Sequence, residues 1–502
     1  MDKASEQPGA TGDRGEGRTK DQHGVVFPRV DGRRSTTATG RAVVTDALAV
    51  VDSAGSFAAR RETSWRSGYV AHFRRLVEAG LESPEAWQSI AGDGLRSLHD
   101  RMRWASADGE EMPLREVFVA GGSGAGYERE TVQGMGEPER ELAVPLGGRR
   151  LTGDALHRQL DAWVERGSIE PGCAEAVRAV MAHPEWLSLP GRTVAVLGAG
   201  AEMGPMTSLL RWGAEVAAVD LPRPEIWRRV LGDATQRAGR LHLPVRPGAG
   251  ETARRAGADL IHDLPAVTDW VGRLGDGLVL GNYVYADGAT NVRVSMAVDA
   301  LTQRLQQERA ELALAFLATP TDVFAVPGEA VRASVEQYQH PRLSRALRVP
   351  LRTVSGGRLL RRNYVPGEDP GINDSVVVQQ GPNYLLAKRL QRWRAAVARV
   401  EGVQVSVKVA PPTRTRSVVK NRALAAAYAG AHRFGIEVFE PATSNTLMAA
   451  LLVHDLCAPA LGHAHPWQDE AYAAAHGGLW RSAYDPRSAL GIAALLGAAA
   501  AR

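Results

Sequence analysis

A glycine-rich turn near the middle of the chain has the residue types that bind phosphate through the backbone. The apolar run 194–197 leads into Gly198, Gly200 and Gly204, a helical stretch follows, and a second apolar run ends at Asp220. Glycines at such a turn let the backbone approach a pyrophosphate, and the N-terminus of the next helix directs free N–H groups toward it. A carboxylate at the tip of the second strand can accept hydrogen bonds from a ribose. The pattern therefore predicts a dinucleotide site.

The same residues indicate which nucleotide fits. The charge of Asp220 would repel a 2′-phosphate, so we expect NAD, and NADP as the weaker alternative because Arg223 would soften that preference. Methyltransferases use a similar opening unit for S-adenosylmethionine, so a transferase is a second hypothesis. A catalytically inactive protein that retains the nucleotide fold is the third.

Strands and helices must alternate to position this turn. Apolar runs typical of strands continue through the second half of the chain, and helical patterns lie between them; the runs are 277–285, 312–317, 403–409 and 436–439, and the helices are 291–307, 384–400, 424–434 and 446–456. This alternation predicts an α/β fold, a Rossmann-like doubly wound parallel sheet with helices on both faces.

Composition divides the chain into four parts. Residues 1–40 are polar and lack periodicity, which predicts a disordered tail. We expect a helical N-terminal region at 41–188, the Rossmann-like domain at 189–460, and a C-terminal helical extension at 461–502. Within the domain, residues 322–380 have Pro, Gly and Arg clusters with weak periodicity. We expect them to form an insertion that covers the site as a lid.

The order of motifs over roughly residues 190–460 resembles the short-chain dehydrogenase/reductase family. That family opens with the turn Thr-Gly-x-x-x-Gly-x-Gly; here Leu197 replaces its threonine and Glu202 its middle glycine. The His-Asp-Leu segment around Asp263 is similar to the family's segment whose aspartate contacts adenine. Asn282 matches the asparagine of the family's Asn-Ala-Gly strand end.

The residues that resemble the family's catalytic group follow in the same order. Asn291 opens a helix as the family's structural and catalytic asparagine does, and Thr319 ends a strand where the family has its serine. Tyr384 and Lys388 match Tyr-x-x-x-Lys at the head of a helix. The separation between Thr319 and Tyr384 is much longer than in the family, so either a lid is inserted there or the assignment is wrong. Ser375 is a weaker candidate closer to Tyr384.

The resemblance implies a role for each of these side chains. A carbonyl that accepts hydride needs a proton donor, and a phenol is a poor donor at neutral pH unless a cation lowers its pKa. Tyr384 and Lys388 share a helix face, so we expect Lys388 to lower that pKa and to hold the nicotinamide ribose. Thr319 would polarise the carbonyl, and Asn291 would hold a water that relays protons. The full set of expected cofactor contacts is Gly198, Gly200, Gly204, Asp220, Asp263, Asn282 and Lys388.

These motifs predict an NAD(P)-dependent oxidoreductase for an unidentified small-molecule substrate, and composition argues against other partners. The net charge is +4 over 502 residues and its basic residues are almost all Arg, so we expect no nucleic-acid partner. Cys173 and Cys457 are far apart without metal-ligand spacing, which predicts no metal site and a cytoplasmic location. The sequence has no apolar run of about 18 residues, so we expect no membrane segment. A homo-oligomer is compatible with the sequence.

Overall fold

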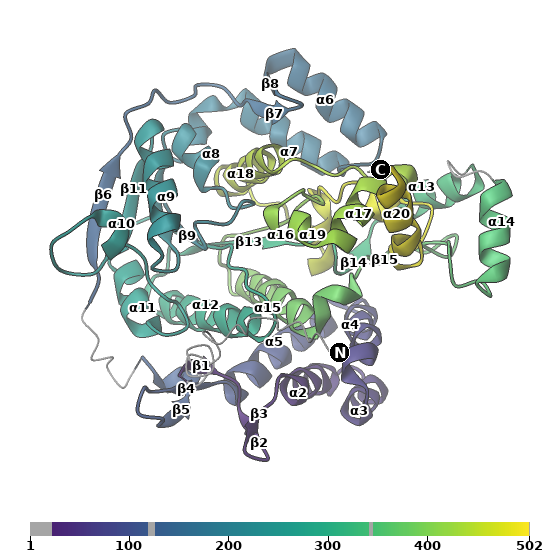
Figure 1. Cartoon of the computed structure of the whole chain (residues 1–502), viewed down its shortest axis with the longest axis horizontal. Coiled ribbons are helices and arrows are strands. Elements are labelled where there is room, and N and C mark those ends of the chain that lie inside the picture. The colour runs from purple at the N-terminus through teal and green to yellow at the C-terminus, as the bar shows by residue number, and fades with distance from the viewer. Residues whose placement is uncertain (1–22, 119–125, 341–344, 501–502) are drawn as a thin grey trace, which may run out of the picture.

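The computed structural model describes residues 23–118, 126–340 and 345–500 and has a seven-stranded sheet at its centre (Figure 1). The strands of this sheet are β6 (Glu128–Gln133), β9 (Thr193–Leu197), β10 (Glu215–Val219), β11 (Arg240–Val245), β12 (Leu278–Asn282), β13 (Ala313–Ala318) and β16 (Val405–Val409). Their spatial order is β16-β13-β12-β9-β10-β11-β6. All neighbours are parallel except β11 and β6, which are antiparallel.

The parallel strands are laid down in two directions from β9. The chain first moves outward to β10 and β11, then crosses to the other side of β9 and builds β12, β13 and β16. The carboxyl ends of β9 and β12 therefore flank the point at which the strand order reverses. The predicted α/β fold with a mostly parallel central sheet is confirmed.

Successive side chains of the strands pack into two different cores. On β9, Ala195 and Leu197 belong to one buried cluster, whereas Val194 and Val196 belong to the other. This is the alternation expected of a strand whose neighbours point to opposite faces. Because both faces are buried, the strand reads in sequence as one continuous apolar run.

One face of the sheet, below it in Figure 1, is covered by two helical layers. The inner layer has α11 (Leu264–Gly272), α12 (Ala289–Glu308) and α15 (Gly381–Val400). The outer layer comes from the N-terminal region and has α2 (Thr36–Leu48), α3 (Ser53–Arg61), α4 (Trp65–Gly80) and α5 (Pro84–Arg101). The helices α2, α4 and α5 pack on α15, so α15 lies between the sheet and other helices.

The opposite face carries the remaining helices of the N-terminal region. They are α6 (Gly153–Glu165) and α7 (Pro171–Ala182), and they share a core with α8 (Met206–Arg211), α9 (Pro224–Gln236) and α18 (Pro441–Cys457). The residues grouped at 41–188 are therefore divided between two faces, and β6 from the same region extends the sheet. An amphipathic pattern shows that a helix buries one side but not which partner it buries against.

Residues 23–40, predicted as part of a disordered tail, have regular structure. Residues 1–22 lie outside the described residues, but residues 23–40 form three short strands and the start of α2. These strands are β1 (Gly24–Val26), β2 (Arg29–Val30) and β3 (Arg33–Arg34), and β1 heads a small sheet with β4 (Arg103–Ala105) and β5 (Glu111–Pro113). Val25 and Val26 are fully buried. A tertiary contact of this kind leaves no periodic signal in so short a segment.

Residues 322–380 contain regular structure and share a core with the C-terminal residues. They form β14 (Val323–Val326), α13 (Gly328–Gln339), α14 (Arg345–Val354) and β15 (Gly371–Asp374), and β14 pairs antiparallel with β15. Phe324 packs with Ala474 and Trp480 in one buried cluster. The C-terminal residues contribute α19 (Pro466–Tyr472) and α20 (Pro486–Ala500), and α20 packs on α17 (Arg422–Gly430). Shorter elements are β7 (Val144–Leu146), β8 (Arg149–Leu151), α10 (Thr252–Arg255) and α16 (Arg416–Lys420).

Candidate functional site

The glycine-rich turn follows β9 directly, and packing requires its first glycine. Gly198 has a φ of +89°, and a Cβ added there would lie 2.8 Å from the carbonyl oxygen of Tyr283. The N–H groups of Gly198 and Ala199 both donate to the carbonyl oxygen of Val219, which ties the turn to the end of β10. Gly198 therefore allows the turn to pass between the ends of β10 and β12. This packing role is separate from any role in binding a phosphate.

The helix after the turn is short. It starts at Met206 and has only six residues. Pro205 precedes it, and a proline disfavours helical backbone at the residue before it, here Gly204. The carbonyl oxygen of Gly204 instead accepts a hydrogen bond from Nδ2 of Asn445 on α18. The contribution of this helix N-terminus to a phosphate site stays a prediction.

A charged pair spans the turn. The carboxylate of Glu202 accepts hydrogen bonds from the backbone N–H of Arg416 at 2.8 Å and from its Nε at 3.0 Å. Arg416 opens α16, the first helix after β16. The residue that replaces the family's middle glycine thus links the turn to the opposite half of the sheet.

Asp220 reaches the glycine turn from the end of β10. Its Oδ2 accepts a hydrogen bond from the N–H of Gly200 at 2.6 Å, and its Oδ1 accepts one from Leu221 at 2.7 Å. Burial raises the pKa of Asp220, while these bonds and the charges of Arg229 and Arg223 oppose that rise. A Cβ on Gly200 would lie 3.1 Å from Asp220 Oδ2. Gly200 therefore leaves the space in which the carboxylate meets the turn.

Asp263 is held by the N-terminal region. Its Oδ2 accepts hydrogen bonds from the hydroxyl of Tyr127 at 2.7 Å and from the backbone N–H of Asp259 at 3.1 Å. The segment leading to it passes next to the second strand, because Ala258 donates to the carbonyl oxygen of Asp220. Asp263 thus lies at the end of a segment that borders the turn, with its carboxylate engaged by Tyr127.

Lys388 lies in a buried polar network that joins α15 to β12 and β13. Its Nζ donates to the carbonyl oxygen of Leu317 at 3.4 Å and to Oε1 of Gln391 at 3.2 Å. Gln391 donates in turn to Oδ1 of Asn282 at 3.3 Å. Burial lowers the pKa of Lys388 to about 8, and the charge of Asp322 opposes this fall. The structure therefore joins the predicted residues Lys388 and Asn282 through Gln391.

The hydroxyl of Tyr384 meets the end of β13. The polar side chains of Thr319, Thr321 and Gln380 lie close enough to it to affect its pKa. The two threonine Oγ1 atoms are 2.9 Å apart, and Thr321 donates to Oε1 of Gln380 at 3.1 Å although 59 residues separate them. Burial raises the pKa of Tyr384, and these polar neighbours oppose the rise only in part. The expected lowering of this pKa by Lys388 is wrong: the shift has the opposite direction, and Lys388 bonds elsewhere.

Asn291 lies in the first turn of α12 and is 2 % exposed. Its Oδ1 accepts a hydrogen bond from Ala286 at 3.1 Å, and its Nδ2 has no hydrogen-bond partner within the described residues. A buried amide donor of this kind is a place for an ordered water. The alternative residue Ser375 is also buried and donates to Oδ1 of Asn373.

Two further tyrosines lie beside Tyr384; the sequence offered Tyr285 as an alternative to Tyr384, and Tyr428 was not foreseen. The ring of Tyr285, just after β12, lies edge-on to that of Tyr384 with centroids 6.2 Å apart. Tyr428 on α17 also interacts electrostatically with Tyr384. The position of Tyr285 after a strong strand was a usable signal, since parallel strands end at one edge of a sheet. Tyr428 lies in an alanine-rich helix that has no such signal.

Several findings describe the setting of this group. No protein-family model and no curated protein matches the chain. Two cavities lie away from this group of side chains, one between α15 and the outer helices and one beside residues 362–368. Among residues 23–118, 126–340 and 345–500, no helix is long and apolar enough to cross a membrane. The same part of the chain has no group of three or more His, Cys, Asp or Glu side chains that could hold a metal ion.

Proposed function

We propose that the chain is an NAD(P)-dependent oxidoreductase that transfers hydride between the cofactor and a carbonyl or alcohol carbon of a small molecule. The observation that carries this proposal is the meeting of Tyr384 with Thr319 and Thr321 on the sheet that also bears the glycine turn and Asp220. When the six parallel strands are numbered by their order in the chain, from β9 to β16, their spatial order across the sheet is 3-2-1-4-5-6. This is the strand order of Rossmann folds, which bind dinucleotides at the point where the order reverses. The likeness to short-chain dehydrogenases and reductases supports the same reading.

The residues near the turn fit the adenosine half of the cofactor. Each carboxylate oxygen of Asp220 accepts one backbone hydrogen bond and keeps acceptor capacity for a ribose hydroxyl. A 2′-phosphate would meet this negative charge, although Arg223 and Arg229 lie close enough to reduce the repulsion. The proposal therefore favours NAD and allows weaker binding of NADP.

The hydroxyl group at the end of β13 fits the reacting end. A bound nicotinamide would supply or accept the hydride. Thr319 or Thr321 would donate a hydrogen bond to the substrate oxygen, and Tyr384 would give it a proton as negative charge develops. The raised pKa of Tyr384 keeps the phenol protonated at neutral pH. That state suits reduction of a carbonyl, whereas oxidation of an alcohol requires the deprotonated form.

Lys388 and Asn291 have supporting roles in this proposal. The ammonium group of Lys388 is held by Leu317 and Gln391, so we assign it to a ribose hydroxyl rather than to the pKa of Tyr384. The unpaired Nδ2 of Asn291 would hold a water that returns a proton to the site. Both roles follow from the family likeness and are compatible with these contacts.

A nucleotide-binding protein without catalytic activity is the second candidate function. Glu202 supports it, because this acid stands where a pyrophosphate would approach and is neutralised by Arg416. A second observation supports it: Lys388 bonds to Leu317 and Gln391 and does not lower the pKa of Tyr384. Such a protein would bind NAD with an intact Tyr384 cluster and transfer no hydride.

The melting temperature of the purified protein with candidate nucleotides tests the proposal. We expect NADH to raise it, NADPH to raise it less and S-adenosylmethionine to leave it unchanged, since a ligand stabilises the state that binds it. A rise with S-adenosylmethionine alone would favour the transferase, and no rise with any nucleotide would overturn both candidate functions. If NADH binds, nicotinamide absorbance in the presence of a panel of aldehydes and ketones distinguishes the oxidoreductase from the inactive protein.

A further inference from the structure

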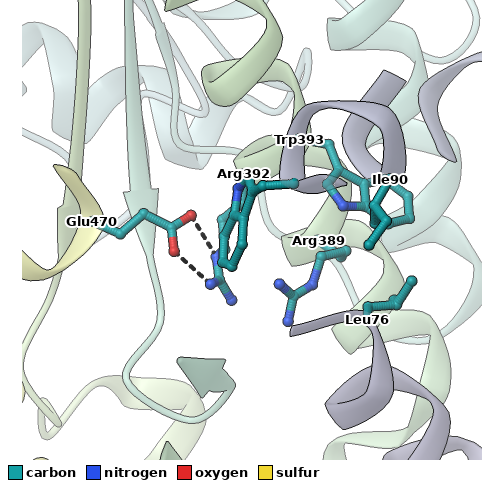
Figure 2. Close-up of a pocket in the computed structure, with 7 residues that line it drawn as sticks. Leu76, Ile90, Arg389, Arg392, Trp393 and Glu470 are labelled. Carbon is teal, nitrogen blue, oxygen red and sulfur yellow. Dashed lines mark hydrogen bonds and ion pairs between the residues drawn. The ribbon is translucent and has the colours of Figure 1, made fainter. Parts of the chain in front are cut away.

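A small buried cavity lies on the side of α15 that faces the outer helices. It is lined by Leu76 of α4, Trp87 and Ile90 of α5, and Arg389, Arg392, Trp393 and Glu470. Figure 2 shows the guanidinium groups of Arg389 and Arg392 side by side, with Leu76 and Ile90 on the side of the outer helices. Arg389 is 2 % exposed and Arg392 3 %. Two arginines at this depth need compensating groups, because an unpaired buried charge is costly.

Arg392 has a full set of such groups. Its Nε and Nη2 donate to the two oxygens of Glu470, at 2.9 and 2.5 Å, and its Nη1 donates to Oδ2 of Asp322 at 2.7 Å. The guanidinium also lies 4.1 Å from the ring centroid of Phe324. Attraction to the two carboxylates outweighs burial and raises the pKa of Arg392.

Arg389 is bound at one nitrogen only. Its Nη2 donates to Oδ1 of Asp322 at 3.1 Å and to the carbonyl oxygen of Val323 at 3.3 Å. Its Nε is buried and has no hydrogen-bond partner among the described residues. Burial and the charge of Arg392 lower the pKa of Arg389 to about 10. Arg389 therefore shares its one carboxylate with a better-paired neighbour, and its Nε is an unpaired donor in a side chain that lines the cavity.

The charges around Asp322 do not balance. Lys388 interacts with the same carboxylate, so three cations, Lys388, Arg389 and Arg392, surround two acids, Asp322 and Glu470. Both oxygens of Glu470 already accept from Arg392, and the walls toward α4 and α5 are aliphatic and aromatic. A water in the cavity would need acceptors for its own hydrogens, whereas an anion needs donors only.

We propose that this cavity binds one monatomic anion, chloride under ordinary conditions, through Nε of Arg389. The space open to the centre of a water-sized sphere is about 10 Å³, which is room for a single water or ion and too small for an organic anion. The cavity is separate from the proposed nucleotide site, although both involve the charge of Lys388. Its anion would neutralise the surplus charge on α15 and join that helix to α4 and α5.

Thermal unfolding of the full chain tests the site. Sodium chloride replaces sodium gluconate stepwise at constant ionic strength, and the melting temperature is recorded. We expect a saturable rise of about 2 °C or more with chloride, since the ion stabilises the folded state to which it binds. Equal melting temperatures in the two salts would overturn the proposal.

Two variants of α15 separate the cavity from general salt effects. Arg389→Lys keeps a cation near Asp322 but removes Nε, so its melting temperature should no longer respond to chloride. Arg394→Lys is the matched control, because Arg394 is equally buried on α15 but is bound at Nε and Nη2 by Asp299; it should keep the response. An unchanged response in Arg389→Lys would overturn the assignment.

Crystals of the unsubstituted protein soaked in sodium bromide provide a measurement that does not depend on a variant folding. We expect an anomalous scattering peak in the cavity within hydrogen-bonding distance of Nε of Arg389. A cavity that holds only a water, without an anomalous peak, would overturn the proposal.

Discussion

The two halves of the candidate site are built in different ways. The proposed adenosine side consists of residues 193–220, a single stretch in which strand, turn and acid follow one another, and its central contact joins Gly200 to Asp220. The reacting side consists of a strand end and a helix start that lie far apart in sequence, and one of its contacts joins Thr321 to Gln380. The first half is local, and the second exists only because residues 322–380 fold into elements that pack with the C-terminal residues.

This difference decides what each half tolerates. In the local half, the turn is fixed by backbone hydrogen bonds to Val219 and by the close approach of Gly198 to Tyr283. Side chains there can change function without moving the backbone. In the reacting half, the position of Tyr384 depends on residues 322–380, so a change in that unit reaches the site through packing.

The largest effect is expected on the reacting side. Tyr384→Phe should lower turnover by about 10²–10⁴, because only the proton donor is lost, and should leave NADH affinity nearly intact. Single-turnover nicotinamide absorbance and calorimetry measure the two quantities. Tyr285→Phe is the matched control, since the Tyr285 side chain is half exposed and its hydroxyl bonds only to Asp287 among the described residues. Normal turnover in Tyr384→Phe would remove Tyr384 from the chemistry.

On the adenosine side, Asp220→Asn should change cofactor choice rather than turnover. The amide oxygen can still accept from Gly200, but the hydrogen bond from Leu221 and the negative charge are lost. We expect NADH to bind about tenfold more weakly and NADPH to lose less affinity, measured by calorimetry, because a charged acceptor binds a hydroxyl more strongly than a neutral one. Glu251→Gln, an exposed acid paired with Arg228, is the control. An unchanged NADH to NADPH ratio would place the ribose elsewhere.

A smaller effect of opposite sign is expected at Glu202. Glu202→Gln removes a negative charge at the turn and frees Arg416 from its ion pair. NADH should bind about two- to fivefold more tightly, the scale of an exposed charge, and Arg416→Ala should bind it more weakly. Added salt should reduce both differences. If Glu202→Gln binds NADH no better, the pyrophosphate does not lie at this turn.

An effect on stability rather than on binding or turnover concerns Lys388. Its pKa in the folded protein is about 8 against an ordinary value of 10.5, so the unfolded chain binds more protons between these values. This group therefore adds stability as pH rises through that window, and its charged form costs stability below it. Urea unfolding at neutral and alkaline pH should show that Lys388→Met lacks this gain, whereas exposed Lys420→Met retains it. The same pH profile in wild type and Lys388→Met would mean that Lys388 is not buried as a cation.

Some of this site could be read from spacing alone. Tyr384 and Lys388 lie on one helix, as predicted, and that helix is Gly381–Val400. Their partnership could not be read, because an i, i+4 spacing places two side chains on one face but does not determine what each one meets there. Lys388 meets Leu317 and Gln391, and Tyr384 meets the threonines after β13.

The sequence by itself determined the alternation of strands and helices, the glycine turn and the acid that faces it, because each depends on neighbours within a few turns of the chain. Tertiary structure decided the strand order, the division of the N-terminal helices between two faces, and the buried charges of α15. These depend on which surfaces meet, and an apolar pattern specifies that a surface is buried without specifying its partner. The same holds for Arg389: its Nε is a buried donor without a partner only because α4 and α5 pack against this part of α15.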